Sequence, residues 1–215
     1  MLANVSLLLS INSKVREYNS VGSLRFGIFM DKYAKSCEDR KYDICYVSQF
    51  NWRANIGKID MDSVVEVEKK IFSRIVSICQ ERGYSLSVAM RTQTNNVVEG
   101  SDVYLQELQY FHDMDKQNFA VYVGNSYEKY SSYCVALASN IILGVSSTLL
   151  YEMFGHGKKV IFLGAGSMEM QDREKTKMNF SKLPEDVCIR SMDKDHIENK
   201  ILNLIQKEQN EYLSS

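Results

Sequence analysis

The sequence has little that would indicate a metal centre, a disulfide-rich scaffold or a nucleic-acid-binding surface. Its five cysteines are dispersed without a CxxC pair and its three histidines lie far apart, so we expect neither a zinc site nor a disulfide framework. Lys and Arg number 26 against 27 Asp and Glu, and without a basic excess we do not expect nucleic acid as a partner. HExxH, GxSxG, GxGxxG and P-loop motifs are also absent. Their absence disfavours proteases, hydrolases, dinucleotide oxidoreductases and NTPases.

Long hydrophobic runs are missing as well. Ala3–Ile11 is apolar but too short to span a membrane, and it lacks the basic region and cleavage site of a signal peptide. Four cysteines fall within apolar runs, where a reduced cysteine packs as a small hydrophobic residue: Cys45, Cys79, Cys134 and Cys188. We therefore expect a cytoplasmic protein that can associate peripherally with the inner face of the cell membrane.

From Tyr42 onward the sequence alternates short β-branched runs with longer helical periods. This alternation is typical of βα units on a parallel sheet, and short continuous apolar runs suit strands that are covered on both faces. We predict strands at Asp43–Val47, Ser85–Met90, Ala120–Val123, Asn140–Leu143, Lys159–Leu163 and Val187–Ile189. The predicted fold class is α/β, with one doubly wound, Rossmann-like parallel sheet of about six strands.

Capping patterns place the helices. Ser63 and Glu66 form a capping box at the start of a long predicted helix, and Gly83 follows its last turn. Asp193 is the predicted cap of the closing helix, whose buried stripe is Ile197, Ile201, Leu204 and Ile205. Shorter helices are predicted over 101–111, 126–138 and 148–154. Residues 1–40 hold no complete βα unit, so we interpret them as a tail or a severed interdomain linker, and residues 41–215 as the domain.

The most informative stretch is Ser139–Gly164. A predicted strand there ends in Gly144, and the hydroxyl residues Ser146, Ser147 and Thr148 open the next helix. In a doubly wound sheet, ligands bind outside the carboxyl ends of the strands. The first turn of a helix carries unpaired N–H groups and a partial positive charge, so this helix start predicts a phosphate site. The hydroxyls add donors, and Gly144 allows a close approach of the backbone.

Glu152 lies one turn after Thr148, on the same face of the predicted helix. If a pyrophosphate occupies the helix start, this carboxylate can accept hydrogen bonds from ribose hydroxyls. A structural alternative stays open, in which Ser146 or Ser147 is an ordinary N-cap and Glu152 pairs with Lys158 or Lys159.

Other candidate residues follow neighbouring strands. Gln49 and Arg53 come after the first strand and open on the same edge, where Arg53 could pair with a phosphate. Arg91 ends the second predicted strand and could hold the base or a phosphate; the alternative is an ion pair with Glu99 or Glu107. Gln49 and Arg53 could equally be solvated loop residues. The polar loop after Leu163 either reaches a sugar or phosphate through its basic residues or is a solvated surface: Arg173, Lys175 and Lys177.

The segment G-V-S-S-T-L-L-Y-E (144–152), followed by G-H-G-K-K-V-I (155–161), resembles the nucleotide-sugar site of GT-B glycosyltransferases. It is most similar to the bacterial enzymes that build lipopolysaccharide O-antigen and capsule. The upstream segments YDICYVSQFNWR (42–53) and SLSVAMRT (85–92) follow the same family order, and the resemblance extends over roughly Gly22–Lys207. In that family the carboxyl-terminal Rossmann domain binds the donor, a Ser/Thr-rich turn contacts the phosphates and a Glu one turn later contacts the ribose.

The resemblance implies a donor-binding half of a glycosyltransferase, with a nucleotide sugar and a saccharide or lipid-linked acceptor as partners and no metal or other cofactor. A GT-B enzyme has two Rossmann domains, and the acceptor and the usual catalytic base come from the amino-terminal one. This chain has room for only one, so the implied enzyme needs a separate amino-terminal domain or subunit. The alternatives are a non-catalytic nucleotide-binding or regulatory subunit and a sugar-nucleotide epimerase.

Overall fold

The computed structural model describes residues 23–37, 39, 41–50, 61–93, 97–98, 101–126, 129–145, 147–163, 185–189, 191 and 193–213. Two predicted site residues, Arg53 and Ser146, lie outside these ranges, as does the polar loop after Leu163.

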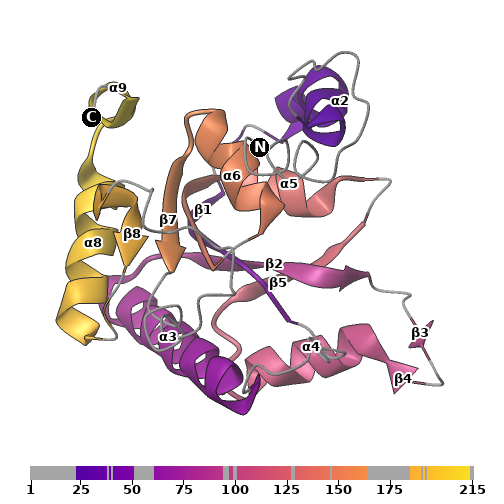
Figure 1. Cartoon of the computed structure of the whole chain (residues 1–215), viewed down its shortest axis with the longest axis vertical. Helices are drawn as coiled ribbons and strands as arrows, with labels where there is room; N and C mark the ends of the chain where they lie inside the picture. The colour runs from indigo at the N-terminus through magenta and orange to yellow at the C-terminus, as the bar shows by residue number, and fades with distance from the viewer. Residues whose placement is uncertain are drawn as a thin grey trace, which may run out of the picture.

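A six-stranded, all-parallel sheet forms the centre of the molecule (Figure 1). Its strands are β1 (Tyr42–Val47), β2 (Leu86–Gln93), β5 (Val121–Asn125), β6 (Ser139–Gly144), β7 (Lys159–Leu163) and β8 (Cys188–Ile189). Their order in the sheet is β5-β2-β1-β6-β7-β8, which is the 3-2-1-4-5-6 order of a Rossmann fold. All six predicted strands and the predicted fold class are confirmed.

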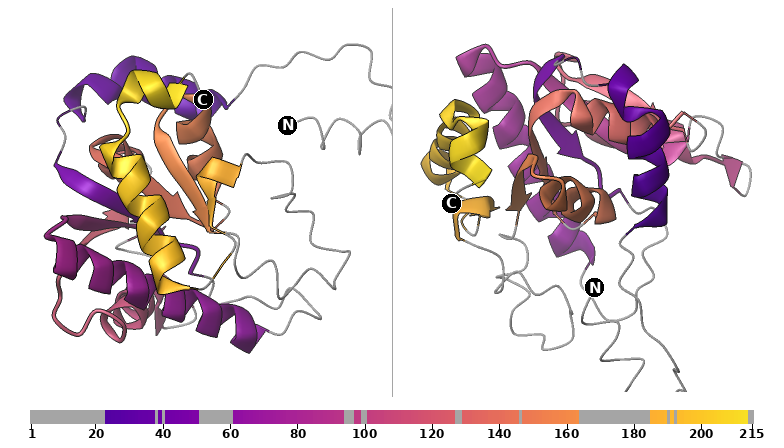
Figure 2. Two further views of the ribbon diagram at one scale, coloured as in Figure 1. Left: turned by 90° about the vertical axis from the view of Figure 1, so that its left-hand side faces the viewer. Right: turned by 90° about the horizontal axis from the view of Figure 1, so that it is seen from above.

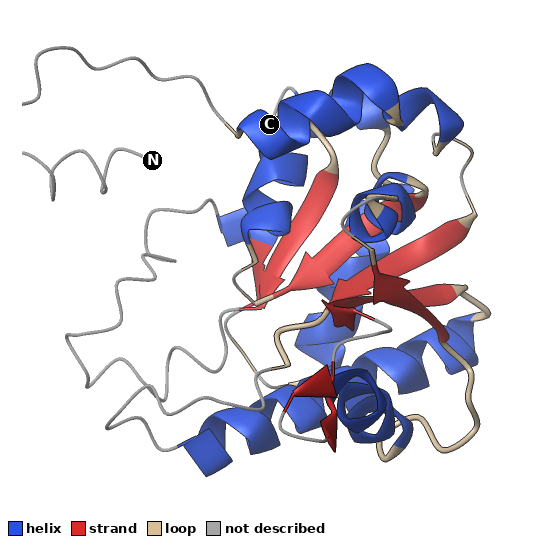
Figure 3. Ribbon diagram, turned by 90° about the vertical axis from the view of Figure 1, so that its right-hand side faces the viewer, coloured by secondary structure: helices blue, strands red, loops and turns tan. Residues whose placement is uncertain are grey.

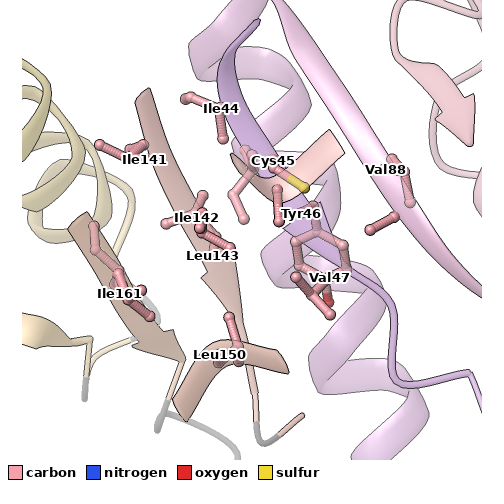
Figure 4. Close-up of a cluster of buried hydrophobic side chains, with 14 of the residues drawn as sticks. Ile44, Cys45, Tyr46, Val47, Val88, Ile141, Ile142, Leu143, Leu150 and Ile161 are labelled. Carbon is pink, nitrogen blue, oxygen red and sulfur yellow. The ribbon is translucent and has the colours of Figure 1, made fainter. Parts of the chain in front are cut away.

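Both faces of this sheet are covered, which explains the continuous apolar character of its strands. All five residues of β7 and the last four of β1 are buried. Ile44, Tyr46 and Ile142 are among the fully buried side chains of the two central strands (Figure 4). The core therefore lies on both sides of the sheet.

The helices form two layers (Figures 1 and 2). One layer holds α3 (Met61–Arg82), α4 (Val103–His112) and α8 (Lys194–Gln206), and the other holds α5 (Ser131–Leu137) and α6 (Thr148–Gly155). α8 packs beside α3, where Arg82 Nε donates to Glu198 Oε1 at 2.7 Å and Lys194 Nζ donates to Glu81 Oε1 at 2.8 Å. Smaller elements are η1 (Ala34–Ser36), the antiparallel pair β3 (Val97–Val98) and β4 (Ser101–Asp102), η3 (Glu185–Val187) and α9 (Gln209–Leu213).

Most predicted helix ends are confirmed, with two corrections. Helix α5 begins at Ser131, five residues after its predicted start at residue 126. Asp193 caps α8 by accepting a hydrogen bond from the His196 N–H, and Gly83 follows α3 with a φ of +70°. The capping box at Ser63 and Glu66 is wrong, because α3 already begins at Met61 and both residues lie inside its first turns. Local sequence indicated that helix but not its first residue.

Part of the segment predicted as a tail or linker is a packed element. Helix α2 (Leu24–Lys32) lies outside α5 and α6 (Figure 2), and Phe29 is fully buried, with its ring 5.1 Å from that of Tyr133 on α5. Residues 23–37 are thus attached to the domain by aromatic packing. The interpretation of residues 1–40 as an interdomain linker stays a prediction.

The cysteine expectation needs a correction. Cys37, just after η1, forms a disulfide with Cys134 of α5, across 97 residues of sequence. Dispersed spacing gave no indication of this pair, because the two residues meet only when the α2–η1 segment folds back onto α5. Cys45, Cys79 and Cys188 are buried and are not disulfide-bonded.

Candidate functional site at the switch point of the sheet

The connections of the sheet diverge between β1 and β6. These neighbouring strands pair Val47 with Gly144 at their carboxyl ends, and the chain leaves β1 toward β2 but leaves β6 toward β7. Figure 3 shows the parallel strands ending at a common edge. The turn after β1 and the turn before α6 therefore lie side by side, at the position where open α/β sheets bind their ligands. Gln49 and Ser147 belong to these two turns.

Helix α6 starts just after the carboxyl end of β6, at this switch point. Ser147 is its N-cap, with extended backbone angles, and the Ser147 Oγ accepts a hydrogen bond from the Leu149 N–H at 3.3 Å. Thr148 follows as an exposed first helical residue. The structural alternative for Ser147 is thus present in the molecule, and it does not preclude a ligand, since a capping hydroxyl retains its own proton for donation to an anion.

Gly144 has a packing role at this site. A Cβ placed there would lie 2.8 Å from Leu150 Cδ1 and 3.2 Å from the Val47 carbonyl oxygen. Figure 4 shows Leu150 of α6 close to the ends of β1 and β6. Glycine therefore lets α6 pack tightly against the strand ends, which keeps the helix start at the edge of the sheet.

Each residue of the turn after β1, from Ser48 to Phe50, takes part in a hydrogen bond. Ser48 Oγ accepts a hydrogen bond from the Phe50 N–H at 3.1 Å, and the Gln49 N–H donates to the Glu68 carboxylate. The Phe50 carbonyl accepts a hydrogen bond from Arg91 Nη1 at 3.1 Å. Gln49 is half-buried in this turn. The turn is therefore prearranged by hydrogen bonds from β2 and α3.

Arg91 lies inside β2 rather than at its end, because the strand continues to Gln93. Its side chain is exposed and contacts the turn after β1, while its backbone N–H donates to Glu107 at 2.9 Å. The structure thus brings Gln49 and Arg91 together. Arg91 contacts Glu107 through its backbone N–H, whereas its guanidinium donates to the Phe50 carbonyl.

Glu107 of α4 was not predicted as a site residue, although it is fully buried. Four donors converge on its carboxylate: the hydroxyls of Ser48 and Thr92 and the N–H groups of Arg91 and Thr92. The sequence contained an indication of this burial, because Glu107 is four residues from both Val103 and Phe111 and therefore lies on the apolar face of α4.

A second carboxylate lies beside it. Glu68 Oε1 accepts a hydrogen bond from the Tyr46 hydroxyl at 2.9 Å, and Oε2 accepts one from the Tyr110 hydroxyl at 3.1 Å. Burial raises the pKa of the Glu68 carboxyl; the two tyrosine hydroxyls and the Gln49 N–H oppose this shift, and the charge of Glu107 adds to it. Burial also raises the pKa of Tyr46.

Glu152, predicted to contact a ribose, accepts a hydrogen bond from the Tyr133 hydroxyl at 2.8 Å. Tyr133 belongs to α5, so this contact joins α5 to α6. The two lysines considered as alternative partners donate to carbonyls: Lys158 Nζ to Leu137 at 2.9 Å, and Lys159 Nζ to Lys207. Tyr133 was not predicted as a partner, because the contact spans 19 residues and two helices.

Two cavities among the described residues lie elsewhere on the molecule. One, of about 470 Å³, is lined by residues of η3, α8 and α9, and another, of about 410 Å³, lies beside the disulfide. Neither includes a predicted site residue, so we place the candidate site by strand topology and helix geometry rather than by cavity size. Within the described ranges, no cluster of three or more His, Cys, Asp or Glu side chains could hold a metal ion. No helix in those ranges has the length and apolar character needed to cross a membrane.

The sheet order and the helix start at its switch point define a Rossmann-like α/β protein. The family model described as "putative O-antigen biosynthesis protein" matches residues 6–213, so the chain belongs to this family. No curated protein matches the chain. The family description indicates a role in the biosynthesis of surface polysaccharide.

Proposed function

We propose that the chain binds the nucleotide-sugar donor of a glycosyltransferase that acts in O-antigen biosynthesis. The observation that supports this most directly is the start of α6, which lies at the switch point with Ser147 as N-cap and an exposed Thr148. A helix N-terminus at that position favours an anion through its amide groups and its partial positive charge. The membership in an O-antigen family fits a donor whose anion is a sugar-linked phosphate.

The proposal gives each neighbouring group a role. The phosphates lie against the start of α6, near Ser147 and Thr148, and the prearranged Gln49 turn faces them from β1. Arg91 supplies a cation at the same edge, and Glu152 accepts hydrogen bonds from the ribose. When the glycosidic bond to the donor phosphate breaks, these groups stabilise the charge that develops on the leaving nucleotide. Prepositioned donors of this kind commonly contribute several kcal/mol to a transition state.

A pair of substitutions at Ser147 tests the phosphate site. Asp and Asn both cap helices about as well as Ser, but only Asp places a negative charge where the phosphate would lie. We expect Ser147→Asp to weaken the binding of nucleoside diphosphates and monophosphates at least about 100-fold, since like charges about 4 Å apart repel by roughly 4 kcal/mol near a protein surface. Ser147→Asn should bind within about fivefold of the native chain.

The measurement is isothermal titration calorimetry with a panel of nucleoside diphosphates and monophosphates, and thermal melting serves as the control for folding. Equal affinities of the Asp and Asn variants, at unchanged melting temperatures, would place the phosphate elsewhere. A native chain that binds no member of the panel would overturn the proposed function itself.

A further inference from the structure

The two cysteines of the disulfide differ from the other three in position and surroundings. Cys37 follows η1 and Cys134 lies on α5, and their Cα atoms are 5.0 Å apart, within the usual range for a disulfide. Cys45, Cys79 and Cys188 are buried in the core, and burial raises the pKa of both the Cys45 and the Cys79 thiols to about 12. Because the thiolate is the reactive form, these core cysteines are poor partners for exchange.

Cys37 and Cys134 are reachable from solvent through a cavity. Both line the cavity of about 410 Å³, together with Lys41, Lys129, Ser36 and Ser131. The cavity gives a small thiol or disulfide access to this pair of cysteines, which the three core cysteines lack. Access thus selects this cysteine pair for exchange.

We propose that Cys37 and Cys134 form a reversible redox site, oxidised by a low-molecular-weight disulfide such as oxidised glutathione and reduced again by the corresponding thiol. One cysteine thiolate attacks the small disulfide, forming a mixed disulfide and releasing one small thiolate. The other cysteine then attacks the protein sulfur of that mixed disulfide and releases the second. Two electrons pass from the cysteines to the small disulfide, and the two protons of the cysteine thiols end on the released thiols.

The bond controls how firmly α2 and η1 are attached to the domain. Phe26 stacks on Tyr133 of α5 with ring centroids 5.9 Å apart, and Tyr33 stacks on Tyr130 at 5.0 Å. In the reduced protein these ring contacts hold the segment; in the oxidised protein a covalent link is added one residue from Tyr133. This inference does not depend on the proposed function, because no nucleotide takes part.

The test uses the whole chain, equilibrated with reduced or with oxidised glutathione and then alkylated. Intact mass and peptide mapping should show a Cys37–Cys134 link after oxidation, with Cys45, Cys79 and Cys188 still present as thiols in the folded protein. The melting temperature of the oxidised chain should be about 5–10 °C above that of the reduced chain, because the link restrains the unfolded state. The shift should reverse when the thiol is restored.

Single variants provide the matched controls. Cys37→Ser and Cys134→Ser should each retain one bound glutathione after oxidation. Both should lose the difference in melting temperature between the two redox states. Cys79→Ala should still form the Cys37–Cys134 link and show the native difference in melting temperature. A folded native chain that forms no Cys37–Cys134 link, links other cysteines, or melts at the same temperature in both redox states would overturn the proposal.

Discussion

Two glutamates flank the turn that follows β1, the buried Glu107 and the half-buried Glu68, and their surroundings differ. Glu107 receives four donors, two of them backbone N–H groups of β2. Glu68 accepts hydrogen bonds from the hydroxyls of Tyr46 and Tyr110. Hydrogen bonds from neutral hydroxyls offset the cost of burying a carboxylate less than hydrogen bonds from charged groups would. Protonation of Glu68 removes both the free-energy cost of holding its charge away from water and the repulsion between that charge and Glu107. At the residue scale the site is therefore sensitive to pH.

The sign of this effect follows from the raised pKa of Glu68. The folded state binds the proton more tightly than the unfolded chain does, so the stabilisation from Glu68 is fully present below about pH 4.5 and is lost as pH rises through the raised folded value. We expect Glu68→Gln to flatten the decline of the unfolding free energy above pH 4.5, measured by urea denaturation at a series of pH values.

Glu81 is the matched control. It is exposed and its pKa is lowered, chiefly by the hydrogen bond from Lys194, so its contribution is lost as pH falls rather than as it rises. Glu81→Gln should leave the decline above pH 4.5 unchanged. If the Glu68→Gln variant and the native chain show parallel pH profiles, burial of the Glu68 carboxyl does not set the pH dependence.

At the scale of elements, the packing of α6 on the strand ends positions the phosphate site. Gly144 leaves no room for a Cβ between Leu150 and the Val47 carbonyl. The Val47 contact is with backbone and cannot move aside easily, so a side chain at residue 144 must shift α6 or the end of β6. The same glycine that suggested a close approach to a ligand is required here by the protein itself.

We expect Gly144→Ala to lower the unfolding free energy by about 1–3 kcal/mol, the usual cost of overpacking a core. Gly155→Ala, in the last turn of the same helix, meets nothing within 4 Å and should be neutral or stabilising by up to about 1 kcal/mol. Chemical denaturation of the two variants checks this. A Gly144→Ala chain as stable as the native one would show that α6 can move without cost.

At the scale of the whole molecule, the described ranges contain one parallel sheet with its switch point at β1 and β6. Sugar transfer needs a general base within about 3 Å of the acceptor hydroxyl and a site that is closed to water. In the proposed function a facing domain or subunit supplies both. The chain would then bind the donor and leave activation of the acceptor to its partner.

Without such a partner, the chain should therefore bind nucleotide sugars but turn them over slowly or not at all. The assay combines a panel of nucleotide sugars with a saccharide or lipid-linked acceptor, with and without a candidate amino-terminal domain, and it includes Ser147→Asp as a binding-deficient control. Transfer that appears only with the added domain and is lost in the Asp variant is the expected result. Efficient transfer by the native chain alone would contradict the need for a facing domain.

Local sequence was sufficient to predict the main elements and the edge of the sheet where the candidate site lies. The β-branched runs predicted all six strands, and the Asp193 cap predicted the start of α8, because such signals depend on neighbours a few residues away. The order Gly144, Ser147, Thr148 predicted a strand, a cap and a helix for the same reason.

Which segments meet depends on the tertiary fold and could not be predicted. Pairing of β1 with β6, the contacts of Glu107 with β2 and of Tyr133 with Glu152, and the Cys37–Cys134 bond all join residues that are distant in sequence. The local sequence around each of these residues is compatible with several different contact partners. The partner is selected by the free energy of burying both faces of the sheet at once, which a local pattern does not encode.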